Sequence, residues 1–206
     1  MITSILRDRQ LLDVIGAENL KPRLDFSGSD LSGSHMDYLI LPGADFSGTH
    51  LSWCMALFAD FQRASFDSAD LSGCIIASQL AGASFADANL EGAIISGNVS
   101  KVTLNNARVA LSCWVGAEFE NPKDIKAAKG WENAFYADRD LVILGLPPDH
   151  NLKLVRSLLA RYPILPPEAR LLVVKVFEGL RNLAGSQGEM IKALSKPLPP
   201  IGPAPK

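Results

Sequence analysis

A square coil of β-structure followed by a helical C-terminal region is the fold class that this 206-residue sequence predicts. Between Leu24 and Asn121 the chain divides into twenty consecutive units, eighteen of five residues and two of four. The third residue of nearly every unit is large and apolar, and the first is usually small. After Asn121 this period ends, and apolar residues recur at helical spacing instead.

A period of five fits neither a long helix nor a long strand, so the chain must turn a corner at every unit. Four units then make one coil, and the twenty units make five coils, or a rod about 24 Å long at the ~4.8 Å spacing of adjacent strands. Residues stack by type along each side. The first side collects Phe26, Phe46, Phe66, Phe85 and Leu104, and the third collects Met36, Ala56, Ile76, Ile95 and Trp114. Both four-residue units, CIIA and AIIS, fall on this third side.

The units ADFSG, ADLSG and ANLEG resemble those of the pentapeptide-repeat family, in which Ala, Asp or Asn, and Leu or Phe precede two free positions. The resemblance implies a right-handed quadrilateral β-helix over residues 24–121. CIIA and AIIS depart from the family rule. The segment WENAFY, followed by LGLPPDHN, is similar to the tail that follows the repeats in many bacterial members, which implies a cap over the last coil.

The flanking segments are predicted from apolar spacing and from Pro and Gly positions. Residues 1–23 are expected to form an N-terminal helical cap, since the open end of a stacked coil must be covered. Residues 122–146 are expected to form a helical C-terminal cap. Residues 147–195 predict a helical hairpin, with helices ending near Tyr162 and spanning about Glu168 to Leu183, and then a short helix. Residues 196–206 form a Pro-rich tail that is expected to be extended.

Apolar side chains occupy outward positions of the third side, where other sides carry Asp, Asn and Ser. A contiguous apolar strip on a solvent face predicts that something covers or binds it. Three coverings are open: the C-terminal hairpin, which we favour, the same face of a second chain in a homodimer, or a foreign protein. The strip comprises Tyr38, Met55, Leu57, Phe58, Ile75, Ala77, Ile94 and Val115.

Charge is divided along the chain: residues 24–121 carry eleven acids and three bases, a balance of −8, and residues 122–206 carry eight acids and thirteen bases, a balance of +5. The repeats therefore predict acidic faces, built from Asp25, Asp30, Asp45, Asp60 and Asp70. No apolar run reaches the length of a membrane span, and the first residues are charged. We therefore expect a soluble, cytoplasmic protein.

Residue patterns for catalysis or cofactor binding are missing from the sequence. It shows no phosphate-binding loop, GxSxG motif or metal-ligand spacing, and His35, His50 and His150 are scattered. Cys54 and Cys74 fall at the same inward position one coil apart, and Cys113 is expected to face outward, where it could react. We expect no catalytic, cofactor-binding or metal-binding residues, and no enzyme.

Two functions remain as hypotheses. The first is a non-catalytic repeat scaffold that binds an unknown protein partner through a patterned face. The alternative, implied by the family resemblance, is protection of DNA gyrase or topoisomerase by mimicry of DNA through acidic faces, without direct binding of nucleic acid. A rod of about 24 Å and a basic C-terminal region weaken this alternative. An enzyme site in the helical tail is a third and weaker possibility.

Overall fold

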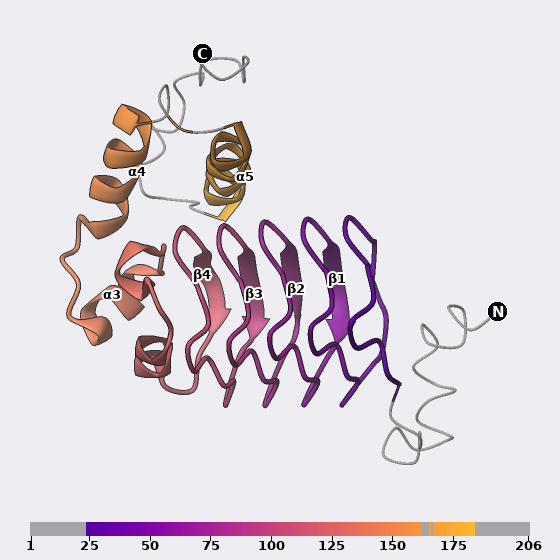
Figure 1. Ribbon diagram of the computed structural model, residues 1–206. Helices are drawn as coiled ribbons and strands as arrows, with labels where there is room; N and C mark the ends of the chain where they lie inside the picture. The colour runs from indigo at the N-terminus through magenta and orange to yellow at the C-terminus, as the bar shows by residue number, and fades with distance from the viewer. Residues whose placement is uncertain (1–23, 162–164, 166, 184–206) are drawn as a thin grey trace.

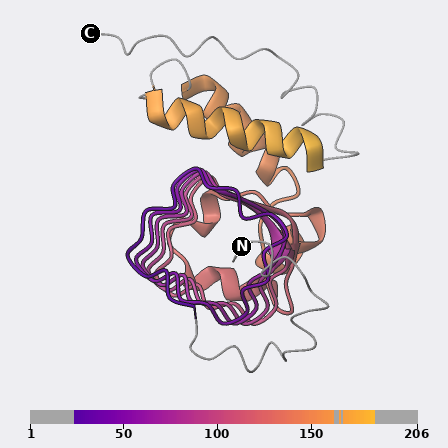
Figure 2. The ribbon, with the colours of Figure 1, turned by 90° about the vertical axis from the view of Figure 1, so that its right-hand side faces the viewer.

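The computed structural model describes residues 24–161, 165 and 167–183, and the predicted N-terminal cap, short helix and Pro-rich tail lie outside them. The described chain forms a β-helix followed by helices that cover one end and one side of it (Figure 1). The predicted fold class, a right-handed quadrilateral β-helix with a helical C-terminal region, is confirmed. Viewed along its axis, the coils superpose around a common core (Figure 2).

Parallel pairing holds the coils together. On the third side, β1 (Met55–Asp60), β2 (Ile75–Gln79), β3 (Ile94–Asn98) and β4 (Cys113–Glu118) form a parallel sheet in that order. On the other sides the pairing reduces to single bridges. One of these ladders contains Asp25, Asp45, Ser65, Ser84 and Thr103. Backbone hydrogen bonds of 2.7 to 3.2 Å, such as Phe26 N to the Asp45 carbonyl at 2.7 Å, join neighbouring coils.

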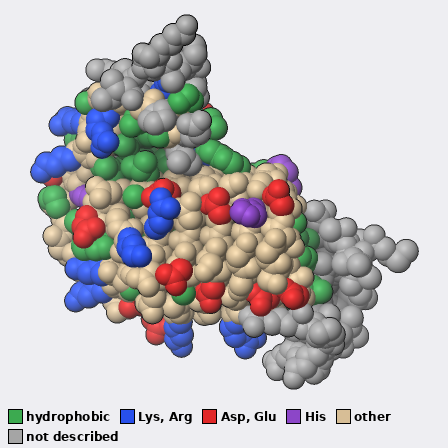
Figure 3. Space-filling model, viewed as in Figure 1, with side chains coloured by type: hydrophobic (Ala, Val, Ile, Leu, Met, Phe, Trp, Pro, Cys, Tyr) green, Lys and Arg blue, Asp and Glu red, His purple; other side chains and the backbone are tan. Residues whose placement is uncertain are grey.

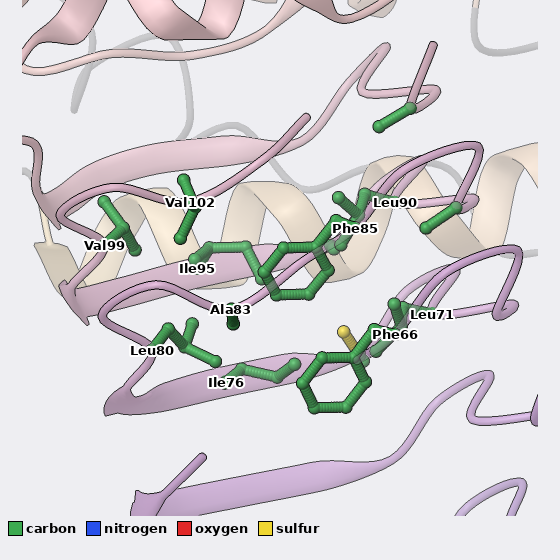
Figure 4. Close-up of a cluster of buried hydrophobic side chains, with 14 of the residues drawn as sticks. Phe66, Leu71, Ile76, Leu80, Ala83, Phe85, Leu90, Ile95, Val99 and Val102 are labelled. Carbon is green, nitrogen blue, oxygen red and sulfur yellow. The ribbon is translucent and has the colours of Figure 1, made fainter. Parts of the chain in front are cut away.

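Large inward residues of the same type stack in the core, as the sequence predicted. Phe46 and Phe66 lie parallel with ring centroids 5.0 Å apart, and Phe66 and Phe85 repeat the same distance. Figure 4 shows this column beside those of Leu71 and Leu90 and of Ile76 and Ile95. Because the repeat returns each side chain to the same place in successive coils, one apolar ladder per side fills the interior.

The corners are tight turns in which the last residue of a unit usually adopts a left-handed conformation. Glycine occupies many of these positions, including Gly28 and Gly48, with φ near +65°. The aspartate before the turn accepts a hydrogen bond from the backbone two residues later, as in Ser27 N to Asp25 Oδ1 at 2.8 Å. These two devices explain why glycine and aspartate recur outside the core.

The cap differs from the single helical face expected over the last coil. Two 3₁₀ turns, η2 (Pro122–Ala127) and η3 (Trp131–Asn133), precede α3 (Asp138–Leu144). Between them the backbone still pairs with the repeats, because Val109 N bonds to the Lys129 carbonyl and Trp114 N to that of Phe135. The chain therefore adds most of an irregular sixth coil. Its backbone supplies hydrogen-bond partners to the edge of the fifth coil, whose N–H groups would otherwise be unpaired.

Asn151 closes the ladder. It is the second residue of α4 (His150–Arg161), and its side-chain amide accepts from Tyr136 N at 3.3 Å and donates to the Tyr136 carbonyl at 2.7 Å. His150 Nε2 lies 2.9 Å from the Ala134 carbonyl. Buried side chains thus take the place that another coil would fill.

The antiparallel partner of α4 is α5 (Pro167–Leu183), and the two helices lie against the β-helix (Figures 1 and 2). Their apolar faces form a second core with outward residues of the third side. This second core comprises Ile94, Cys113, Phe135, Val155, Leu158, Val173, Val176, Phe177 and Leu180, with Ile75 and Val115 packed against it.

Candidate functional site

A groove of about 670 Å³ runs along the corner that follows the third side. It crosses all five coils, because its lining begins at Tyr38 in the first coil and reaches Glu118 in the fifth. Four coil spacings give it a length of about 19 Å. The lining residues are Tyr38, Ile40, Phe58, Ala59, Asp60, Ala77, Ser78, Gln79, Ser96, Gly97, Gly116 and Glu118.

The two four-residue units create the floor of this groove. Each lacks the fifth residue that would make a left-handed corner, and the strand continues past Ala77 and Ser96 instead. The fifth coil has Gly116 at the same corner, paired with Ser96. Small residues thus follow one another along the floor, and a side chain at Gly97 would overlap the Ser78 carbonyl oxygen.

Ser78 satisfies the irregularity that the missing residue introduces. The register between β1 and β2 shifts between Leu57 and Asp60. The Ser78 hydroxyl, which is buried, donates to the Ala56 carbonyl at 2.8 Å and accepts from Ala59 N at 3.3 Å. The Ser78 side chain therefore bridges Ala56 and Ala59 across the bulge that separates the floor from the aromatic end.

Two aromatic rings form one end of the groove. Tyr38 and Phe58 stack with centroids 5.5 Å apart, and they are 58% and 70% exposed. Both occupy the left-handed corner position, with φ of 60° and 57°. The left-handed conformation of a bulky residue destabilises the fold by about 1 kcal/mol or more, and an exposed ring buries too little surface to offset this.

Two other bulky corner residues are used for packing. Trp53 and Leu111 also have left-handed φ, but Lys175 of α5 lies over the Trp53 ring at 4.7 Å and Leu111 packs against the second core. Both residues lie at the corner that precedes the third side, whereas the groove lies at the corner that follows it, and both contact the hairpin. Among the described residues, Tyr38 and Phe58 belong to neither apolar core, so their strained, exposed stack is a reason to regard the groove as a functional site.

Charge in the groove is negative. Asp60 and Glu118 contribute carboxylates, and the described residues that line the groove include no Lys, Arg or His. Asp60 is held by its neighbour, since Gln62 donates to it from its backbone N at 3.1 Å and from Nε2 at 3.2 Å. The arrangement offers aromatic faces and fixed negative charge, and it contains neither a nucleophile paired with a base nor a set of metal ligands.

The predicted apolar strip is divided between the hairpin and the groove. Ile94 is buried beneath α5, where Gly179 contacts its side chain, and Ile75 and Val115 pack against the same cluster. Met55 and Leu57 are half-buried. Tyr38 and Phe58 stay exposed, and Ala77 lies in the groove floor.

The repeats match a known protein family. Eight copies of the family model described as pentapeptide repeats match residues 23–52, 44–77 and 59–97. Residues 23–97 are pentapeptide repeats. No protein with a curated description matches the chain.

Solved structures similar to the chain are also pentapeptide-repeat proteins. A trypsin-treated variant of QnrB1, described as a plasmid-mediated fluoroquinolone resistance protein, is 24% identical over 55% of this chain and 66% of its own, with a TM-score of 0.27. A protein from Nostoc Pcc 7120 is 22% identical over 66% of this chain and 91% of its own, with a TM-score of 0.28. One from the Arabidopsis thaliana thylakoid lumen is 26% identical over 63% and 77%, with a TM-score of 0.21.

The predicted acidic residues do not form one continuous field on the pentapeptide-repeat domain. Asp25 and Asp45 share a ladder that continues with Ser65, and the ladder of Asp30 and Asp70 is interrupted by His50. All five of the predicted aspartates hold the turns of their own units, because each accepts a hydrogen bond from the backbone N–H two residues later. These residues are Asp25, Asp30, Asp45, Asp60 and Asp70. On the face shown in Figure 3, most acidic side chains are scattered among uncharged, basic and histidine side chains.

Local hydrogen bonds also set the electrostatics of these turns. The hydroxyl and the backbone N–H of Ser27 lower the pKa of Asp25, and the same groups of Ser32, led by the backbone N–H, lower that of Asp30. The aspartates are therefore accounted for by turn formation, whatever else they bind.

Cys113 departs from the expectation of a reactive thiol. It does point away from the coil, but the helical hairpin covers it completely, and burial raises its pKa to about 12. Cys54 and Cys74 are buried free thiols inside the pentapeptide-repeat domain. Among the described residues no group of three His, Cys, Asp or Glu side chains could hold a metal ion, and no helix is long and apolar enough to cross a membrane.

Sequence reasoning identified Tyr38 and Phe58 as part of a strip but missed the groove beside them. The signal was present in the two four-residue units, which fall at the same corner in successive coils. Their effect on shape depended on the strand continuing through the missing corner, and the period alone does not determine that path.

Proposed function

We propose that this chain is a non-catalytic scaffold that binds another protein through the corner groove. The stacked pair of Tyr38 and Phe58 carries the proposal, because both rings occupy a strained corner conformation and are exposed. Aromatic side chains of this kind are enriched at the centres of protein interfaces. The rigid coil would present them in a fixed position, at little conformational cost on binding.

The position of the hairpin on the third side also supports the groove as the binding surface. The helical hairpin packs over Ile75 and Ile94, and within the described part of the chain the corner with Tyr38 and Phe58 is the end of the apolar strip that stays exposed. A homodimer through the strip would have to use this corner. A foreign partner would meet the same surface.

Differential capture tests the proposal. The full chain, the double variant Tyr38→Ala/Phe58→Ala and the control Val142→Ala/Ile143→Ala are immobilised and exposed to a cell extract. Val142 and Ile143 are exposed apolar residues of α3, outside the groove lining, and so they match the change in surface hydrophobicity.

Proteins captured by the full chain and by the control, but not by the groove variant, are then purified and titrated. The expected loss of affinity for the groove variant is about tenfold or more, since two central aromatic contacts are removed. Equal binding by all three chains would refute the groove as the binding surface. Loss by the control alone would place the interface on α3 instead.

A further inference from the structure

We propose that residues 196–206 of this same chain, KPLPPIGPAPK, occupy the corner groove. The proposal uses the groove of the proposed function but does not require an outside partner. It would make the tail a built-in competitor, which any partner protein must displace.

The groove has the dimensions of an extended peptide. Its lining crosses five coils, so it is about 19 Å long. A polyproline II segment rises about 3.1 Å per residue, and about six residues would span the groove. The floor of Ala77, Ser96, Gly97 and Gly116 has no large side chain that would obstruct such a segment.

The side chains of the groove match the chemistry of the tail. Proline-rich segments bind grooves with exposed aromatic rings, because a preformed polyproline II helix loses little entropy on docking. Tyr38 and Phe58 supply such a surface, and the tail holds Pro197, Pro199, Pro200, Pro203 and Pro205.

Charge complements this match. The lining, as far as the described residues form it, contains Asp60 and Glu118 and has no Lys, Arg or His. The proline-rich segment begins with Lys196 and ends with Lys206, and it has no acidic residue. Docking would place at least one ammonium group near a groove carboxylate, which favours this segment over a neutral proline-rich one.

The tail is long enough to reach the groove. Helix α5 ends at Leu183 and packs on the third side, where Gly179 contacts Ile94. Twelve residues, 184–195, separate that end from the proline-rich segment. Fully extended, they would span about 40 Å, which exceeds the length of the whole groove.

A spin label on the full-length chain tests the proposal. Cys54, Cys74 and Cys113 are all buried, so a nitroxide attaches selectively to an added cysteine in the variant Ala204→Cys, which keeps both lysines. Amide signals are compared in the oxidised and reduced states. We expect loss of the signals of Ser96 and Gly97 in the groove, and preserved signals for Asp25 and Asp45.

Two further variants of the labelled chain identify the contacts. In the Tyr38→Ala/Phe58→Ala background the groove signals should return, whereas Val142→Ala should leave them lost. Asp60→Asn/Glu118→Gln should weaken docking by roughly threefold to tenfold, as for two partly exposed ion pairs. Groove signals that stay sharp in the Ala204→Cys chain, or that stay lost without the two rings, would overturn the proposal.

A mixed sample separates this chain from a second copy. Isotope-labelled chain without nitroxide is combined with unlabelled chain that carries it. Unchanged groove signals in the mixture support docking within one chain, and lost signals would overturn it in favour of exchange between two copies. The capture experiment can fail or succeed independently, because it asks only whether an outside protein binds.

Discussion

A core phenylalanine and a corner phenylalanine contribute differently to the stability of this protein. Phe66 and Phe58 are both aromatic, but Phe66 lies fully buried in the core stack and Phe58 is 70% exposed in a left-handed conformation. The first must be aromatic because its neighbours stack on it. Nothing in the packing of the described chain makes the same demand of the second.

Substitution of these two residues should therefore have very different effects. Phe66→Ala should lower the free energy of unfolding by about 3 to 5 kcal/mol, since it leaves a cavity between Phe46 and Phe85. Phe58→Gly should change it by less than about 1 kcal/mol, because relief of the left-handed conformation offsets the lost stack with Tyr38. Urea unfolding followed by circular dichroism measures both. A large loss in Phe58→Gly would show that the exposed ring is needed for folding.

Gly97 is required by contact as well as by conformation. Its φ is 91°, and an added Cβ would overlap the backbone of Ser78 in the neighbouring coil. Gly97→Ala should destabilise the protein by about 2 to 3 kcal/mol, because the floor strands must separate. Gly28→Ala is the matched control, since φ is 65° there and nothing lies within 4 Å of the new Cβ. It should cost about 1 kcal/mol. Equal losses in thermal unfolding would contradict a special role for the groove floor.

Asp140 is a buried carboxyl in the first turn of α3, and one of its oxygens, Oδ2, has no hydrogen-bond partner. Burial raises its pKa above the ordinary value of 3.8, although Arg139, at 3.5 Å from Oδ1, acts in the opposite direction. The folded state therefore binds a proton more readily than the unfolded state does. This group destabilises the fold at neutral pH, and the effect fades as pH falls through the raised pKa.

Asp140→Asn should consequently raise the free energy of unfolding at pH 7. The difference from the parent chain should shrink as pH is lowered toward 3.8, where Asp140 becomes protonated in both states. Denaturant unfolding of both chains across this range measures the difference and cancels the contribution of the other carboxylates. A difference that does not change with pH would mean that Asp140 does not titrate as described.

At the scale of elements, the end of the ladder is closed by one amide. Asn151→Ala should destabilise the protein by about 2 kcal/mol, since it leaves the N–H and the carbonyl of Tyr136 buried without partners. The effect should be local, with hydrogen exchange faster at Tyr136 and Phe135 than in the central coils. Lys153→Ala, at an exposed position of the same helix, is a suitable control. Uniformly faster exchange would indicate that the cap controls the entire β-helix.

The repeats could be predicted from sequence because each side chain meets copies of itself. Phe26, Phe46 and Phe66 share one position in the period, and their stacking follows from the period alone. The cap could not be predicted in the same way. Its apolar residues have helical spacing, but Lys129 and Phe135 pair with the unpaired edge of the last coil, so that the chain forms only short 3₁₀ turns before α3. Tertiary hydrogen bonds thus overrode local preference.

The candidate site was predictable only in part. Tyr38 and Phe58 stood out as apolar residues among polar ones, whereas Ser78, Gln79, Gly97 and Glu118 gave no signal of their own. They come together because successive coils align the same corner, and because the hairpin covers the other end of the third side. The alignment of the corners and the position of the hairpin both depend on the path of the backbone, which the sequence pattern alone does not determine.

At the scale of the whole molecule, the hairpin protects an apolar face and a thiol. Phe177→Asp places an unpaired charge in the buried contact between α5 and the β-helix, at a cost of about 3 to 5 kcal/mol. The hairpin should detach, and the exposed Ile75 and Ile94 should then cause self-association. Cys113 should become the first cysteine to react with a thiol reagent.

Light scattering measures the self-association, and titration with a thiol reagent measures the reactivity of Cys113. Val142→Asp introduces the same charge on the exposed face of α3 and should remain at the parent mass with an unreactive Cys113. Circular dichroism of Phe177→Asp should keep the signal of the β-helix. If Cys113 stays unreactive and the mass does not change, the hairpin is not the cover that holds this face.

The two missing corner residues give the chain a feature that can be edited by length. Restoring one glycine after Ala77 and another after Ser96 would return both units to five residues and fill the floor, without altering any existing side chain. Duplicating a coil that contains a four-residue unit would instead lengthen the groove by one step of about 4.8 Å. In such a protein, the number of coils that contain a short unit would set the length of the small-residue floor.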